Sequence, residues 1–141
     1  MYRRIIQITL AAAVFAVAAT PALAAKGGNT GSGSTITLVT LGSSAGALSA
    51  QSASPKVGDN VTFDVQTAAT DRPYILLNCY QGRNWIYGAQ AFYSSTNPPI
   101  FTLSSSGWTS GTAECTARLG KLNADGTRFT DLASTTFSVS G

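Results

Sequence analysis

Apolar and polar residues alternate along most of the chain after residue 34, and this alternation constrains the fold more than any other feature. Successive residues of a strand point to opposite faces, so the pattern predicts strands that each bury one face. It is clearest in residues 61–67 and 112–122. No stretch of useful length after residue 34 has the periodicity of an amphipathic helix. The sequence therefore predicts an all-β chain.

Turn signals rich in Gly, Pro, Asn and Asp recur at intervals of roughly ten residues and divide the alternating region into short segments. Seven or eight such strands predict an antiparallel β-sandwich of two sheets. Gly88 is a candidate break in its strand, and a kink is expected near Asp131 and Leu132. The predicted strands are residues 35–41, 61–67, 74–80, 85–93, 100–104, 112–122 and 127–139, with residues 42–54 either a loop or a weak edge strand.

The faces of these strands follow from the same alternation. Thr62, Asp64 and Gln66 are expected to point outward, and so is the ring of Tyr80. The residues expected to point inward are Val61, Phe63, Val65, Ile75, Leu77, Cys79, Phe101, Leu103, Ala113, Cys115, Ala117, Leu119, Phe137 and Val139.

The first 24 residues have the order of parts of an export signal. Arg3 and Arg4 precede an apolar run at residues 5–19, and Ala22-Leu23-Ala24 forms a small-x-small cleavage site. The run is shorter than the ~20 apolar residues of a spanning helix, and a retained anchor is the alternative. We expect a cleaved signal peptide at 1–24, a flexible Gly/Ser-rich leader at 25–34, one domain at 35–141 and a secreted product without stable membrane insertion.

Charge excludes one class of partner. The chain has nine basic and six acidic residues, and loss of Arg3 and Arg4 with the signal leaves seven against six, a net charge of +1. The remaining basic residues are scattered along the sequence, whereas nucleic-acid binders cluster theirs on one face. We therefore expect no nucleic-acid partner.

Cys79 and Cys115 lie in the middle of alternating segments, on the apolar face, 36 positions apart. In an oxidising compartment two such residues pair, and closing a loop of this size stabilises a fold by roughly 4 kcal/mol. A redox-active pair needs closer spacing and a helix start beside it. A zinc site needs more ligands, and the chain has no histidine. We predict one buried structural disulfide, no metal site and no cofactor.

Four motifs carry a resemblance to a known family: Gly58 to Phe63, Cys79-Tyr80-Gln81, Trp108, and Ala133 to Val139. In these the chain resembles small exported immunoglobulin-like domains of bacteria and their phages, over roughly residues 35–141. The resemblance implies an immunoglobulin-like sandwich with residues 55–63 entering strand B, Cys79 in strand C, Cys115 in strand F and residues 132–139 in strand G.

The chain departs from antibody-type domains, which link strands B and F by a disulfide. Its strand B has no cysteine, and Ala113 replaces the tyrosine two positions before the second cysteine. The disulfide would instead join strands C and F, which are neighbours in one sheet. The resemblance therefore implies no immune recognition.

Catalysis has no support in the residue types present. Without histidine there is no Ser-His-Asp triad. Asp59, Asp71 and Asp125 fall in predicted turns, where Asp bonds its own backbone. Asp64 and Glu114 point outward from strands of opposite sheets, so they cannot form a carboxylate pair. We expect no enzymatic activity.

Aromatic residues crowd the predicted C and C′ strands and suggest a binding surface. The candidate binding residues are Tyr80, Trp85, Tyr87 and Asn84, whereas Phe92 and Trp108 are expected to fill the core and sheet edges. The leading interpretation is a non-catalytic domain for extracellular binding or surface interaction, with an unknown extracellular protein or glycan as partner. One alternative is a carbohydrate-binding module that stacks these aromatics on sugar rings. Another is a structural component of an envelope or phage.

Overall fold

The computed structural model describes residues 28–29, 33–41 and 54–141, and these residues form strands and turns but no helix. The predicted signal peptide, most of the predicted leader and residues 42–53 lie outside the described residues. Among the described residues, no helix is long and apolar enough to span a membrane. The strands are β1 (Gly28–Asn29), β2 (Thr35–Leu41), β3 (Asn60–Gln66), β4 (Tyr74–Gln81), β5 (Asn84–Phe92), β6 (Phe101–Thr102), β7 (Ala113–Leu122) and β8 (Phe129–Val139).

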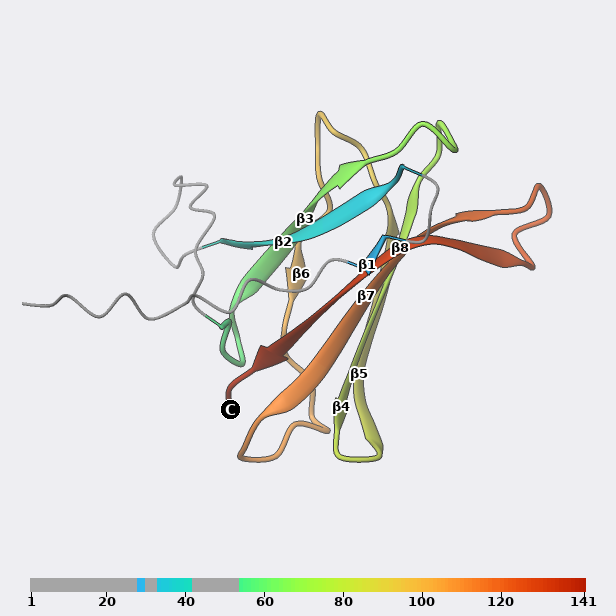
Figure 1. The fold of residues 1–141 in the computed structure, drawn as a ribbon. Helices are drawn as coiled ribbons and strands as arrows, with labels where there is room; N and C mark the ends of the chain where they lie inside the picture. Colours follow the sequence, from blue (N-terminus) through green and yellow to red (C-terminus); the bar gives the residue numbers. More distant parts are fainter. Residues whose placement is uncertain (1–27, 30–32, 42–53) are drawn as a thin grey trace, which may run out of the picture.

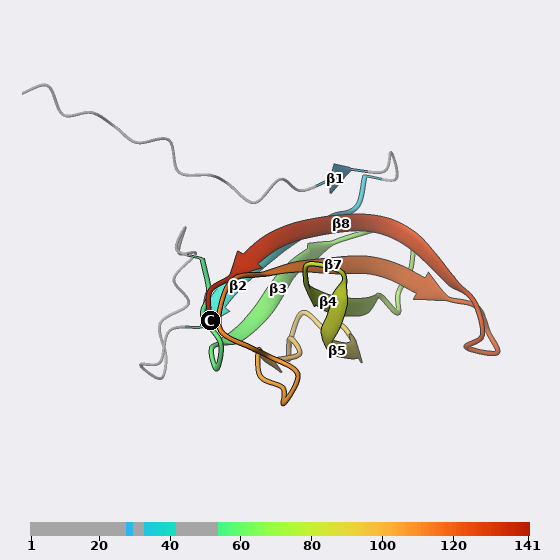
Figure 2. The same cartoon turned by 90° about the horizontal axis from the view of Figure 1, so that it is seen from below.

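The strands form two antiparallel sheets (Figure 1). The larger has the order β1-β8-β7-β4-β5, and the smaller has the order β2-β3-β6. Figure 2 shows the curvature of β7 and β8, whose connecting hairpin projects beyond the other strands. The all-β prediction is confirmed, and β2 has the predicted bounds.

One core lies between the two sheets and contains the residues that alternation placed inward. Val61 and Phe63 of β3 belong to the same buried cluster as Ile75 and Leu77 of β4, and all four are at most 1% exposed. The Phe63 ring reaches Phe137 of β8, with ring centroids 6.3 Å apart. Because both sheets contribute to this cluster, the molecule has the layered arrangement of a sandwich.

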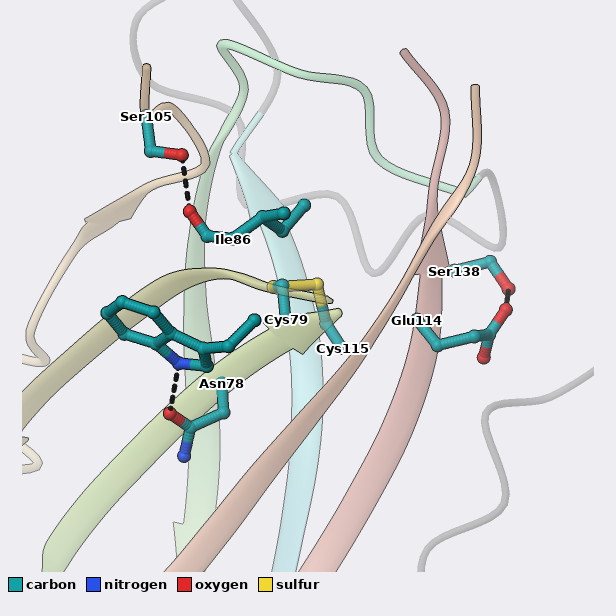
Figure 3. The surroundings of a disulfide bond; sticks show 8 residues. Asn78, Cys79, Ile86, Ser105, Glu114, Cys115 and Ser138 are labelled. Carbon is teal, nitrogen blue, oxygen red and sulfur yellow. Dashed lines mark hydrogen bonds between the residues drawn. A yellow bond between two sulfur atoms is a disulfide. The ribbon is translucent and has the colours of Figure 1, made fainter. Parts of the chain in front are cut away.

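The predicted disulfide between Cys79 and Cys115 is confirmed (Figure 3). The two residues face each other across neighbouring strands β4 and β7, with their Cα atoms 4.0 Å apart and both side chains fully buried. Residues of an antiparallel pair without mutual backbone hydrogen bonds lie closer together than those of a hydrogen-bonded pair, which brings the two side chains within bonding reach. The covalent bond therefore links the central strand β7 to its neighbour β4 on the core side of the larger sheet.

Two β-bulges interrupt the larger sheet. β7 pairs Leu119 with Ala133 and Gly120 with Asp131, so Leu132 is the additional residue at the predicted kink. The second bulge lies in β5, where Cys79 pairs with Tyr87 and Tyr80 with Trp85, leaving Ile86 as the additional residue. The break considered at Gly88 is absent, because β5 continues through it.

Thr62 corrects the expected alternation of β3. It was expected to point outward into solvent, but it is only 6% exposed. Its hydroxyl donates to the carbonyl oxygen of Pro99 at 2.8 Å. The segment that leads into β6 therefore covers this side of β3, which a strand pattern alone cannot reveal. Ser34, the residue before β2, is also buried and hydrogen-bonds to Thr67 at 2.8 Å.

Candidate functional site

Trp85 lies on the outer face of the larger sheet, which faces away from the core. The tight hairpin at Gly82 and Arg83 pairs Trp85 with Tyr80, whose ring points outward as predicted. Gly82 has a positive φ of 61°, and such a glycine at the first loop position suits a two-residue hairpin. Trp85 and Tyr80 are 60% and 42% exposed. The hairpin therefore places two large aromatic rings in solvent at one end of this face.

The Trp85 indole is held in place by two neighbours. Its Nε1 donates to Oδ1 of Asn78 at 3.0 Å (Figure 3). A Cβ added to Gly88 would lie 2.6 Å from Cζ2 of the indole, so the ring occupies the space where a side chain at residue 88 would stand. The ring thus lies against the backbone of Gly88 with its ring nitrogen satisfied, and most of its surface stays open to solvent.

Asn78 contributes a second feature to this site. Because its Oδ1 accepts from the indole, the orientation of its amide is fixed. Its Nδ2 donates to no atom of the residues that the structure describes, and the side chain is half-buried. We name Asn78, Tyr80, Trp85 and Gly88 the indole site. It offers a fixed aromatic ring, a phenol and an oriented amide donor.

Tyr87 does not belong to the indole site, which corrects the sequence prediction. Two residues apart in an undisturbed strand, Trp85 and Tyr87 would share a face. The bulge at Ile86 separates them, because Tyr87 pairs with inward-facing Cys79. Its ring packs against the core and against Trp108, with centroids 6.4 Å apart. Burial raises the pKa of the Tyr87 phenol above its ordinary value.

The polar residues near the hairpin have different roles. Asn84 is exposed at the start of β5 and remains available to a ligand. Gln81 instead holds the loop before β7, since its Oε1 accepts from the backbone nitrogen of Thr109 at 3.1 Å and its Nε2 donates to the carbonyl of Thr109 at 3.0 Å. Trp108, in that loop, is half-buried against the core as expected.

The opposite end of the outer face carries aromatic rings that are already engaged with one another. Tyr74 packs edge-on against Phe92 and Phe129, with centroids 4.8 and 6.4 Å away. Arg72 lies over Phe92 and Arg118 over Phe129. Arg118 also forms a bidentate ion pair with Asp131, which raises the pKa of the guanidinium through their hydrogen bonds. We name Tyr74, Phe92, Phe129 and the two arginines the aromatic ladder.

Phe92 lies at a sheet edge, one of its two expected places, because β5 ends the larger sheet. Its ring is on the outer face and is 48% exposed. It pairs directly with Tyr74 of β4, which explains its contact with the ladder. Sequence reasoning missed the whole ladder, because its members are far apart in the chain. The only available signal was that Tyr74 precedes inward-facing Ile75 and must therefore point outward.

Asp64 lies on β3 and Glu114 on β7, so the two belong to different sheets as predicted. Glu114 accepts a hydrogen bond from Ser138 at 2.6 Å. No group of three or more His, Cys, Asp or Glu side chains within residues 28–29, 33–41 and 54–141 could hold a metal ion. The indole site offers an exposed aromatic ring and hydrogen-bonding groups.

Comparison with known proteins adds no further constraint: no protein-family model, curated protein or solved structure matches the chain.

Proposed function

We propose that this chain is a secreted, non-catalytic, immunoglobulin-like binding domain that takes its ligand at the indole site. The observation that carries the proposal is the exposed Trp85 indole, which a hydrogen bond and a glycine hold in position before any ligand arrives. Tryptophan is enriched among residues that dominate binding energy, and a ring fixed in advance loses little conformational entropy on binding.

The strand order supports the immunoglobulin-like part of the proposal. With β3, β4, β5, β7 and β8 taken as strands B, C, C′, F and G, the larger sheet has the order G-F-C-C′ of immunoglobulin-type sandwiches. The disulfide is consistent with an oxidising compartment, and the predicted signal peptide at residues 1–24 favours export.

A glycan is the ligand class that the indole site favours, which makes a carbohydrate-binding module the second candidate function. A flat ring with one open face suits the apolar face of a sugar ring, and the amide donor of Asn78 is suited to a hydroxyl oxygen. A protein ligand would use the same indole as an anchor inserted into a pocket.

A depletion assay with insoluble polysaccharides tests the proposal. The full chain is expressed with its own signal peptide and recovered from the periplasm of a bacterial host. It is then mixed with cellulose, chitin, xylan or peptidoglycan sacculi. We expect at least one polymer to bind the protein, and Trp85→Ala to weaken that binding more than about tenfold. Ile100→Ala is the matched control, because Ile100 is equally exposed at 62% but belongs to the segment that enters β6.

Gly88→Ala tests whether binding requires the Trp85 ring in its observed position or only its presence. The added methyl group displaces the indole without removing it, so the variant should bind as weakly as Trp85→Ala while remaining folded. If no polymer binds, the glycan ligand is wrong. If a polymer binds equally well to wild type, Trp85→Ala and Gly88→Ala, the indole site itself is wrong.

A further inference from the structure

We infer that the free edge of β5 pairs with β5 of a second copy of this chain, joining two larger sheets into one continuous sheet. This inference rests on the backbone of β5 and is independent of the proposed ligand. β5 ends the larger sheet and is nine residues long, whereas β1 at the other end has two residues. Figure 1 shows β5 with a neighbouring strand only on the β4 side.

Three residues of β5 have backbone groups that no other strand or loop of the described residues uses. The nitrogen of Tyr93 donates to the carbonyl of Pro73 at 2.8 Å, so the backbone groups of Tyr93 point toward the segment that enters β4. Backbone groups alternate along an antiparallel strand, so those of Phe92, Gln90 and Gly88 point the other way. They meet no backbone partner among the residues that the structure describes.

The edge also lacks the features that keep sheet edges apart. Natural edge strands are protected by charged side chains, by proline or by a covering segment. β5 contains no charged residue and no proline. The loop before β7 covers only its beginning, where the Ser105 hydroxyl donates to the carbonyl of Ile86 (Figure 3). β2 ends the smaller sheet, and none of its residues from Leu38 to Leu41 is exposed. It is therefore the less accessible of the two long outer strands.

The covered carbonyl of Ile86 selects the register. An antiparallel pair centred on Gln90 uses the three free positions in full, opposing Gly88 to Phe92 and Gln90 to its own copy. If the centre of the pairing shifted toward Gly88, Ile86 would have to pair as well, although its carbonyl already accepts from Ser105. In the register centred on Gln90, Phe92 of each copy lies opposite Gly88, whose side-chain space Trp85 fills. Two of the largest exposed apolar side chains thus meet across the junction.

Charge substitution at the two-fold axis tests both the dimer and its register. The exported product of the full chain should show a dimer in sedimentation equilibrium at micromolar concentrations. Gln90→Lys places two like charges directly opposite each other, and Gln90→Glu does the same. Each variant alone should dissociate at least tenfold more readily. An equimolar mixture should recover the wild-type dissociation constant, because opposite charges then face each other.

Thr136→Lys is the control, because it adds the same charge to an exposed position on the outer face of β8. It should leave the dimer unchanged, and circular dichroism should give one melting temperature for all of these variants. A wild-type monomer at all concentrations, an open series of larger oligomers, or a mixture that stays monomeric would overturn the inference. Sedimentation reports the dimer and the depletion assay reports polysaccharide binding, so failure of the dimer and failure of the indole site are distinguished by separate measurements.

Discussion

The two faces of the larger sheet are made by alternate residues of the same strands, yet different forces hold their side chains. On the inner face, Ile75, Leu77 and Cys79 are fully buried, and their positions follow from burial. On the outer face, Asn78 and Gly88 fix the Trp85 indole at one end. At the opposite end, the rings and arginines of the aromatic ladder contact one another. Stability should therefore depend mainly on the inner face, and binding on the part of the outer face whose ring is unengaged.

Removing the disulfide from the inner face should lower the free energy of unfolding more than any change on the outer face. Replacing both Cys79 and Cys115 by alanine reopens a loop closed across 36 positions, and we expect the free energy of unfolding to fall by about 4 kcal/mol. Urea denaturation of the periplasmic product measures this loss, with reductant added to wild type as an independent route to the same state. A loss below about 1 kcal/mol would mean that the inner face does not depend on the bond.

The aromatic ladder is where the outer face should also contribute to stability. Tyr74→Ala removes contacts with both Phe92 and Phe129, so we expect a loss of about 1–2 kcal/mol in urea denaturation. Trp85→Ala on the same face should cost less than about 0.5 kcal/mol, because the indole is mostly exposed. Equal losses for the two variants would remove the distinction between the ladder and the indole site.

Thr135 offers a test in which the expected change is a gain in stability, because it is a polar residue on the buried face. It is 1% exposed, and its hydroxyl has no hydrogen-bond partner in the described part of the chain. Thr135→Val keeps the shape and removes the unsatisfied group, so it should stabilise the fold by about 1 kcal/mol. Thr136→Val, one residue away on the exposed face, should leave the urea midpoint unchanged. A destabilised Thr135→Val variant would indicate that the hydroxyl is bonded.

The smallest expected effect concerns Tyr87. Burial raises the pKa of its phenol in the folded state above the unfolded value of about 10. The associated stability is fully present below that unfolded value and is lost as the pH rises through the folded pKa. Urea denaturation from about pH 8 to about pH 11 should therefore show a shallower alkaline decline for Tyr87→Phe than for wild type. Identical curves for Tyr87→Phe and wild type would contradict the inward position.

Much of the inner face could be predicted, because burial imposes period two on a strand. The alternation identified Ile75, Leu77 and the two cysteines, and the kink expected near Asp131 and Leu132 corresponds to the bulge at Leu132. Turn chemistry contained a further signal that alternation alone did not use. A two-residue loop at Gly82 and Arg83 sets Trp85 opposite Tyr80 and therefore on the outer face.

The bulge at Ile86 could not be predicted, and it decides the indole site. It depends on the fit of the Ile86 and Tyr87 side chains into the core, which no neighbouring residue signals. The burial of Thr62 and the aromatic ladder could not be predicted either. Each depends on segments that are distant in sequence, such as Pro99 above β3 or Phe129 beside Tyr74.

The indole site requires the Trp85 indole to lie against Gly88 while most of the side chain stays open to solvent. Nuclear Overhauser contacts from the indole ring protons of the exported protein measure this arrangement directly. We predict strong contacts between the ring and the α-protons of Gly88, and a further contact from the indole N–H to the Asn78 side chain. Contacts from the ring to core residues such as Leu77 or Leu103 would contradict the account, because they would place the indole on the inner face.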